Sequence, residues 1–167
     1  MSTVFTGRVF SVEVDTRRSP DGREHRVEIV RHRPSVVIAP LAGDGRVILV
    51  RQYRPPLDRY TWEFPAGGTN PGEAAEAAAL RECEEEIALV PARVERLGSW
   101  YPVPGYCDEE MIFFRASDLR PPPPDSPHQP DDDEYIEVNT ITLDEARAMV
   151  ARGEIVDLKT AFALTLV

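Results

Sequence analysis

The chain has 167 residues, of which 19 are basic and 29 are acidic, and its formal net charge at pH 7 is −10. This length suits one compact domain, and 42% apolar with 29% charged residues is typical of a globular protein. The sequence has no apolar run near 18 residues, which argues against a membrane span, and the acidic balance argues against a duplex nucleic-acid binder.

The first residues of the chain and its two cysteines indicate the cellular compartment of the protein. Residues 1–8 lack the basic-then-apolar pattern of a signal peptide. Cys83 and Cys107 are too few for a disulfide scaffold, and without an export signal we expect both to be thiols. The sequence therefore predicts a cytoplasmic protein.

The charge is distributed unevenly along the chain. Residues 1–60 hold 11 Arg and 7 acidic residues, a balance of +4, whereas residues 61–167 hold 7 Arg, one Lys and 22 acidic residues, a balance of −14. A solubilising surface is the ordinary explanation of such a surplus. The alternative is that the acidic residues gather where chemistry requires them.

The first 50 residues predict strands. Residues 4–14 alternate loosely and are rich in Val and Phe, which favours a strand, and the Ser-Pro-Asp-Gly sequence at 19–22 favours a turn. A returning strand begins at 27–30, so we expect an N-terminal antiparallel hairpin. The apolar runs at 35–41 and 47–50 predict two further strands.

Residues 73–87 predict a helix, because they contain five alanines and many glutamates with no Gly or Pro. Asn70 is expected to be the N-cap. Leu80, Cys83 and Ile87 recur at helical spacing and predict an apolar stripe.

The second half of the chain predicts an alternation of strands and helices. Pro91 is expected to end the preceding helix. Strands are then expected at 93–101, 110–116 and 135–142, and helices at 143–151 and 156–166.

Residues 121–130 hold six of the 16 prolines, which predicts an extended surface loop, with a proline-rich ligand for a partner domain as the alternative. Strands and helices mix without strict βαβ alternation. This pattern predicts an α+β or layered α/β/α domain.

Three carboxylates of the predicted helix share one face, because Glu82, Glu85 and Glu86 stand at i, i+3 and i+4. They lie towards the C-terminal end of the helix, where the dipole disfavours negative charge, so a cation is needed to compensate them. Oxygen ligands of this kind suit Mg²⁺ or Mn²⁺. Arg81 can pair with Glu73, Glu85 or both. The alternative is a solvated acidic helix face.

The context of these glutamates resembles the Nudix box, G-x5-E-x7-R-E-U-x-E-E-x-G-U, where U is a bulky apolar residue. The matching polar and glycine positions are Gly67, Glu73, Arg81, Glu82, Glu85 and Glu86, and Cys83 and Leu89 fill apolar positions. One position departs from the pattern, since Ala88 stands where the family has glycine. A match at six fixed positions is far more specific than a short glycine motif.

Flanking segments resemble the ADP-ribose pyrophosphatase branch of the Nudix hydrolase family. They lie at 51–54, 62–67, 104–109 and 131–137. The resemblance covers roughly residues 8–155. It implies a Nudix α/β/α sandwich with a mixed sheet. It also implies a homodimer, with an N-terminal hairpin region at 1–33 that dimerises and a hydrolase domain at 34–167.

The resemblance also implies a catalytic site. The metal ligands would be Glu82, Glu85 and Glu86, with the backbone carbonyl of Ala66. A general base is still needed. We expect Glu134, and secondly Asp132, in this role because their loop is rich in acidic residues; a box glutamate such as Glu85 is the alternative. Arg81 would hold the ligand face in shape.

Substrate contacts are expected from segments on both sides of the box. Arg51 and Arg54 can reach phosphate oxygens with planar forks of donors, although strand-edge salt bridges are an alternative for Arg51. Glu63 can accept a hydrogen bond from the substrate or brace Arg54. Tyr106 could pack near the terminal sugar, and Gly105 is also expected to bind the substrate.

We therefore expect a Mg²⁺-dependent hydrolase of a nucleoside diphosphate linked to another moiety, with ADP-ribose first, giving AMP and ribose 5-phosphate. Other nucleotide sugars and dinucleotides, such as GDP-mannose, NADH and FAD, are the alternative substrates. A non-catalytic ADP-ribose-binding module is the alternative class. Neither nucleic acid nor a membrane is expected as a partner.

Overall fold

The computed structural model describes residues 2–126, 128 and 136–167. Its strands are β1 (Ser2–Thr6), β2 (Phe10–Arg18), β3 (Glu24–His32), β4 (Ser35–Pro40), β5 (Val47–Arg54), β6 (Arg59–Glu63), β7 (Ala66–Gly68), β8 (Val90–Trp100), β9 (Met111–Arg120) and β10 (Ile136–Ile141). Its helices are α1 (Ala75–Ile87), α2 (Leu143–Ala151) and α3 (Leu158–Ala163), with a short 3-10 turn at Pro55–Leu57.

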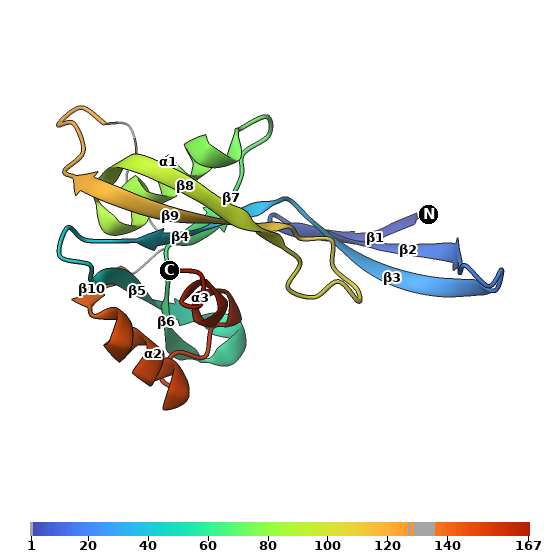
Figure 1. Ribbon diagram of the computed structural model, residues 1–167. Coiled ribbons are helices and arrows are strands. Elements are labelled where there is room, and N and C mark those ends of the chain that lie inside the picture. The colour runs from blue at the N-terminus through green and yellow to red at the C-terminus, as the bar shows by residue number, and fades with distance from the viewer. Residues whose placement is uncertain (1, 127, 129–135) are drawn as a thin grey trace.

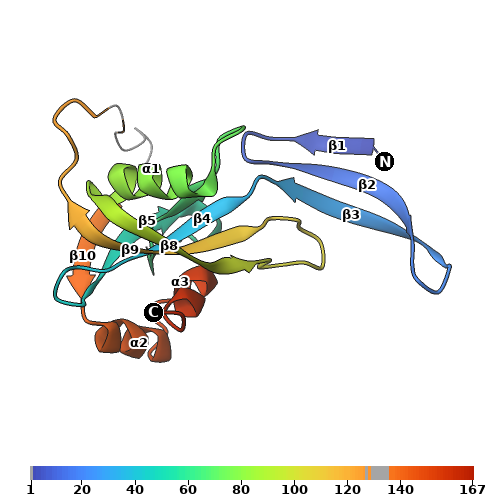
Figure 2. The same cartoon turned by 45° about the horizontal axis from the view of Figure 1, so that its top comes forward.

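Two sheets form the centre of the fold. One has the order β7-β4-β9-β8 and is mixed, because β4 and β9 run parallel while the other pairs are antiparallel. The other has the order β10-β5-β6 and is antiparallel. Helix α1 covers one side of these sheets and α2 and α3 cover the other (Figures 1 and 2). The predicted α/β/α layering with a mixed sheet is confirmed.

The alternation of side chains along β4 explains the three layers. Val36 and Ile38 belong to the apolar cluster that contains the α1 residues Ala78 and Cys83. Val37 and Ala39 belong to the cluster formed with α2 and α3. A strand covered on both faces reads as a nearly continuous apolar run, and β4 is buried at every position and apolar after Ser35.

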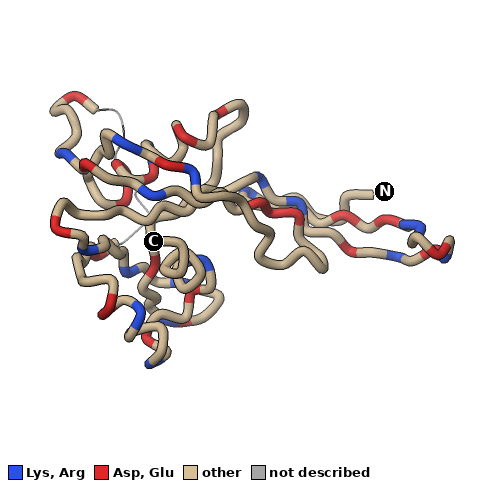
Figure 3. Tube along the Cα trace, viewed as in Figure 1, with Lys and Arg blue, Asp and Glu red and all other residues tan. Residues whose placement is uncertain are grey.

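The N-terminal segment forms a three-stranded antiparallel sheet, β1-β2-β3, which projects from the layered body (Figure 1). The prediction of one strand over 4–14 in a hairpin is therefore wrong. The Gly7 N–H donates to the Phe10 carbonyl at 2.9 Å, and this turn folds β1 back on β2. Basic and acidic residues both occur along this arm (Figure 3).

The main helix begins later than predicted. Asn70 is not its N-cap; residues 70–73 form a turn in which the Glu73 carboxylate accepts from the Asn70 N–H at 2.7 Å. Gly72 has a φ of +79°, which takes the chain off a helical path, so α1 starts at Ala75. Leu80 is half-exposed, and the small side chains of Ala78 and Ala79 face the core instead.

The C-terminal helices have side-chain caps. Thr142 Oγ1 accepts from the Glu145 N–H at 3.1 Å, and Asp157 Oδ2 accepts from the Thr160 N–H at 2.9 Å. The predicted helix at 143–151 is confirmed, whereas the one predicted at 156–166 is shorter, as α3. Of the helices in the described residues, none has the length and apolarity needed to cross a bilayer.

Candidate active site

A pocket of about 1150 Å³ lies beside the box, whose residues Gly67, Arg81, Glu82 and Glu85 line it. It is lined by residues from α1, β6, β7, the start of β9 and α3, and by Arg8 and Val9 from the turn before β2. Ligand pockets commonly have ~300–1,000 Å³. This pocket is therefore large enough for an extended ligand rather than a single small group.

The first wall of the pocket is the tight contact between β7 and α1. Val36 of β4 pairs with Gly67 in the antiparallel β4–β7 ladder, which sets β7 against the helix. A Cβ atom on Gly67 would overlap the Glu82 carboxylate. The glycine that the box requires is therefore needed for close approach of the backbone to a carboxylate.

Arg81 joins the acidic groups of this wall. Its Nε and Nη2 donate to Glu73 at 3.0 and 3.1 Å, and its Nη1 donates to Glu82 at 2.6 Å and to Glu85 at 2.8 Å. Nη2 also donates to the Gly68 carbonyl at 2.9 Å. The hydrogen bonds to Glu73 raise the pKa of Arg81, and those from Arg81 lower the pKa of Glu73. The predicted pairing with both Glu73 and Glu85 is present.

The glutamates of α1 do not form a solvated face. Glu82 and Glu86 are each only 8% exposed, and Glu86 Oε1 accepts from the Ala66 N–H at 3.3 Å. Carboxylates are rarely buried unless a partner compensates them. Burial, with the charges of Glu86 and Glu82 beside it, also raises the pKa of the Cys83 thiol. The acidic cluster is thus built into the helix–sheet interface.

These donors suit a divalent cation by their chemistry. Glu82, Glu85 and Glu86 supply hard oxygen ligands, and the hydrogen bond to Glu86 holds the Ala66 backbone beside them. Arg81 supplies the positive charge between Glu82 and Glu85 in this structure. Within the described ranges, no three His, Cys, Asp or Glu side chains are grouped closely enough to hold a metal ion.

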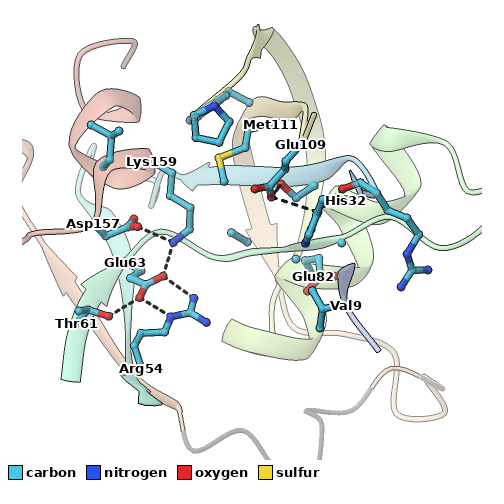
Figure 4. A pocket seen from close by; sticks show the side chains of 18 of the residues that line it. Val9, His32, Arg54, Thr61, Glu63, Glu82, Glu109, Met111, Asp157 and Lys159 are labelled. Atoms are coloured by element: carbon cyan, nitrogen blue, oxygen red, sulfur yellow. Dashed lines mark hydrogen bonds and ion pairs between the residues drawn. The ribbon is translucent and has the colours of Figure 1, made fainter. Parts of the chain in front are cut away.

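The second wall carries the buried carboxylate of Glu63, for which the sequence left two roles open: contact with the substrate or bracing of Arg54. Glu63 accepts from Arg54 Nε at 2.8 Å and Nη2 at 2.6 Å, and also from Thr61 Oγ1 and Lys159 Nζ (Figure 4). Burial alone would raise the pKa of Glu63, but Arg54 and Lys159 lower it to about 2. Glu63 therefore braces Arg54, which was one of its two predicted roles.

Lys159 and Asp157 were not predicted for the site. Lys159 Nζ lies 3.0 Å from Asp157 Oδ1, and Asp157 Oδ2 accepts from Thr160 Oγ1 at 2.6 Å. Thr160 in turn accepts from the Phe64 N–H at 2.7 Å, which fixes α3 to the end of β6. The sequence carried one signal for this site, because Lys159 is its only lysine.

A third group faces the pocket from the strand ends near the arm. Ser35 Oγ donates to Glu109 Oε1 at 2.8 Å, and His32 Nδ1 lies 3.6 Å from the same oxygen (Figure 4). Sequence reasoning placed Glu109 only within a branch-typical segment and did not assign His32 or Ser35. They come from β3, β4 and the loop before β9, so only the fold joins them.

Some predicted substrate contacts lie elsewhere. Arg51 does not line the pocket; it pairs with Glu137 at 3.1 Å and its guanidinium lies 4.5 Å from the Tyr60 ring centroid. Gly105 and Tyr106 lie in the loop between β8 and β9, where the Tyr106 carbonyl accepts from the arm residue Val30 at 2.7 Å. Neither lines the pocket.

The predicted general bases are outside the part of the chain that the structure describes. Glu134 and Asp132 both fall within 129–135. Within the described residues, His128 Nδ1 lies 3.7 Å from Glu85 Oε1. The assignment of Glu134 and Asp132 as bases remains a prediction.

Comparison with known proteins places the chain in a family. A family profile described as "NUDIX domain" matches residues 31–160. "ADP-ribose pyrophosphatase" of Bacillus subtilis (strain 168) is 35% identical over 161 residues, which cover 96% of this chain and 86% of the relative. "Methanol dehydrogenase activator" of Bacillus methanolicus is 34% identical over 161 residues, with the same coverage.

A solved structure is similar over nearly the whole chain. The crystal structure of an "ADP compounds hydrolase" aligns with a TM-score of 0.86 and 26% identity, covering 99% of this chain and 88% of the other. The alignment therefore includes the arm as well as the layered body.

Proposed function

The chain belongs to the Nudix family and is a Nudix pyrophosphatase hydrolase, and from this premise we propose that it cleaves nucleoside diphosphate derivatives, with ADP-ribose as the preferred substrate. The products would be AMP and ribose 5-phosphate, since water adds across the phosphoric anhydride and leaves one phosphate on each product. The relatives with matching names support this choice of substrate.

One observation carries the proposal. Glu82 and Glu85 of α1 both accept hydrogen bonds from Arg81, Glu82 also packs against Gly67, and both carboxylates line a pocket that carries the cations Arg54 and Lys159. A pyrophosphate is repelled by the glutamates alone and attracted by the cations. A site with both is suited to a phosphate ligand that arrives with divalent ions.

Nudix hydrolases use divalent metal ions, and we propose Mg²⁺, with Mn²⁺ as a substitute. Glu82, Glu85 and Glu86 would hold it with the Ala66 carbonyl. When bound, the ion neutralises phosphate charge and lowers the pKa of the attacking water. Arg81 keeps the Glu82 and Glu85 carboxylates at the pocket wall through its hydrogen bonds of 2.6 and 2.8 Å.

The proton of the attacking water needs an acceptor, and we propose Glu134, with Asp132 second. The acidic residues at 131–134 precede β10 in the sequence, and Ile136 at the start of β10 pairs with Gln52, two residues before Arg54. Glu85, which lines the pocket, is the alternative base. Glu134→Gln tests this choice, because unchanged activity would transfer the role to Glu85.

A substrate screen tests the function. The protein is incubated with ADP-ribose, GDP-mannose, NADH and FAD in Mg²⁺, in Mn²⁺ and in chelator. We expect ADP-ribose to be cleaved fastest, and chelator to stop the reaction. Faster cleavage of another compound would reassign the substrate. Tight ADP-ribose binding without turnover of any compound would favour a binding module instead.

Two substitutions test the metal ligands. Glu85→Gln and Glu86→Gln each remove one carboxylate charge while keeping the side-chain shape. We expect each to lower kcat by at least ~100-fold with little change in the far-UV spectrum. Near-normal rates in both variants would contradict the assignment.

We also propose that two copies associate through an N-terminal region at 1–33, next to a hydrolase domain at 34–167. The arm exposes Val4, Phe5, Val9 and Phe10, each with 42–60% of its surface accessible. Exposed apolar groups on a projecting sheet favour a protein partner. Sedimentation of Phe5→Ser/Phe10→Ser should give monomers, whereas the exposed β10 control Val138→Ser should sediment like the wild type.

A cytoplasmic setting completes the proposal. Cys83 and Cys107 are both free thiols in the structure. Free thiols are typical of a reducing compartment.

A further inference from the structure

The only lysine of the sequence lies in the wall of the pocket. The chain uses Arg at 18 of its 19 basic positions and Lys at residue 159 alone. The Lys159 side chain is 10% exposed, and its ammonium group extends from α3 towards Glu63 (Figure 4). Neither the box nor its flanking segments include this residue.

Glu63 has no acceptor capacity left for a ligand. Its Oε1 accepts from Arg54 Nε and Thr61 Oγ1, and its Oε2 accepts from Arg54 Nη2 and Lys159 Nζ. A carboxylate oxygen offers about two lone-pair directions, so four donors saturate the group. Glu63 therefore positions the two cations rather than binding substrate itself.

The two cations keep donors that these contacts do not use. In the described part of the chain, Lys159 contacts the carboxylates of Glu63 and Asp157, which occupy two of its three N–H groups. Within the described residues, the hydrogen bonds of Arg54 use Nε and Nη2 and leave Nη1. Both residues line the pocket, whereas the Glu63 side chain behind them is 3% exposed.

Arg54 and Lys159 form a cationic wall of the pocket, and this wall lies within electrostatic reach of the box glutamates. The hydrogen bonds to Glu63 raise the pKa of Arg54, and the charges of Glu63, Glu86 and Asp157 add to this effect. Because Glu86 belongs to α1, the negative charge of the box glutamates reaches Arg54 across the site. A ligand held at the box glutamates through cations would meet Arg54 and Lys159 on its other side.

Resting on the proposed function, we propose that Lys159 is a substrate-binding residue that forms, together with Arg54, an anion subsite for the non-bridging oxygens of the pyrophosphate. Glu63 and Asp157 hold the ammonium group in place. Charge-assisted hydrogen bonds to phosphate then form without reorganising the wall.

The choice of lysine has a geometric reason. One ammonium nitrogen contacts carboxylates on β6 and at the start of α3, and it keeps a third N–H for a ligand. A planar guanidinium is longer and presents its donors in one plane, so it cannot make the same three contacts from this backbone position. This explains a lysine in a chain that otherwise uses arginine.

Steady-state kinetics with ADP-ribose separate a binding role from a structural one. We expect Lys159→Met to raise KM by about 10- to 100-fold, the range of a charge-assisted hydrogen bond, with a smaller change in kcat. Lys159→Arg keeps the positive charge, so its KM should lie between the values of the wild type and of Lys159→Met. Arg152→Met is the matched control, because Arg152 is an ion-paired cation outside the pocket. A wild-type KM in folded Lys159→Met would overturn the proposal.

Chemical labelling of the wild-type protein tests the same contact without a substitution. Reductive methylation with formaldehyde and cyanoborohydride marks one lysine side chain per molecule, and the amino terminus serves as internal reference. We expect α,β-methylene-ADP with Mg²⁺, at ten times its inhibition constant, to slow methylation of Lys159 at least fivefold, whereas adenosine should not. Equal rates with and without the analogue, or equal protection by adenosine, would overturn the subsite.

The two proposals fail separately. The anion subsite alone would be overturned if the wild type cleaved ADP-ribose, the analogue did not protect Lys159 from methylation, and Lys159→Met kept the wild-type KM. Absence of turnover of every nucleoside diphosphate derivative would overturn the proposed function.

Discussion

Gly67 lies so close to Glu82 that a Cβ atom at residue 67 would overlap the carboxylate. The obstacle is the end of a flexible side chain, which can move, and not the backbone. A larger residue would therefore displace one candidate metal ligand without unfolding the protein.

Gly67→Ala should lower kcat by at least ~100-fold and change the melting temperature by only a few degrees. The reason is that the Glu82 carboxylate must leave its position while the β4–β7 ladder remains. Gly43→Ala is the control, because nothing lies within 4 Å of a Cβ atom there. Full activity in Gly67→Ala would contradict a role for Glu82 in its present position.

Ala88→Gly should stabilise the protein by about 0.5–1 kcal/mol. Ala88 is the C-cap of α1 with a φ of 53°, a left-handed conformation that favours glycine. Ala77→Gly at an exposed position in the first turn of the same helix should destabilise by about 0.5–1 kcal/mol. Urea unfolding measures both, and a less stable Ala88→Gly would contradict the argument. The family glycine is thus a backbone requirement that this chain meets with some strain.

Arg54 and Arg51 make a matched pair of substitutions. Arg54→Met should raise KM for ADP-ribose by about tenfold or more, because its guanidinium lines the pocket. Arg51→Met should leave KM within about threefold, since Arg51 lies against Tyr60 outside the pocket. Comparable losses in the two variants would contradict the assignment of the two faces of β5.

Acid should weaken the protein through Glu63. The pKa of Glu63 is lowered to about 2 from the ordinary value of 4.5. Its ionisation therefore stabilises the fold fully above pH ~4.5, and this contribution is lost as the pH falls from there towards 2.

Glu63→Gln should lower the free energy of unfolding by about 3 kcal/mol at pH 7, the size of a shift of 2 to 3 pKa units. The difference from wild type should shrink as the pH is lowered from 4.5 to 3. Urea titrations at these pH values give the comparison. A difference that stays constant would show that Glu63 gains no stabilisation from its charge.

The two cysteines should react with thiol reagents at different rates. Cys83 is fully buried and burial raises the pKa of its thiol, whereas Cys107 is half-buried near the loop surface. We expect one thiol per chain to react rapidly with Ellman's reagent under native conditions, and two in denaturant. Rapid reaction of two thiols in the native wild type would contradict this packing. A rapidly reacting thiol that persists in Cys107→Ser would also contradict it.

Local spacing accounts for what was predicted correctly. The helix over the box and the shared face of Glu82, Glu85 and Glu86 follow from a period of 3.6 residues, and the strand at 35–40 follows from an unbroken apolar run. The errors lie at boundaries that depend on a turn. Gly72 delays α1, and the turn at Gly7 divides the first predicted strand in two.

Arg51 and Arg54 show a signal that was present in the sequence but incomplete. Residues three apart in a strand point to opposite faces, so both could not reach one ligand from β5. Spacing alone does not say which face carries the pocket. That depends on where α1 and α3 pack against the sheet.

The sequence by itself determined the family, the layered fold and the carboxylates of α1, because all of these follow from residues close together in the chain. The tertiary structure alone decided that Lys159 meets Glu63, 96 residues earlier, and that Ser35 meets Glu109. Such contacts depend on how separate elements pack, and no local spacing encodes them. The acidic surplus of −10 is likewise only a total, whereas the fold places its key members opposite the cations of one pocket.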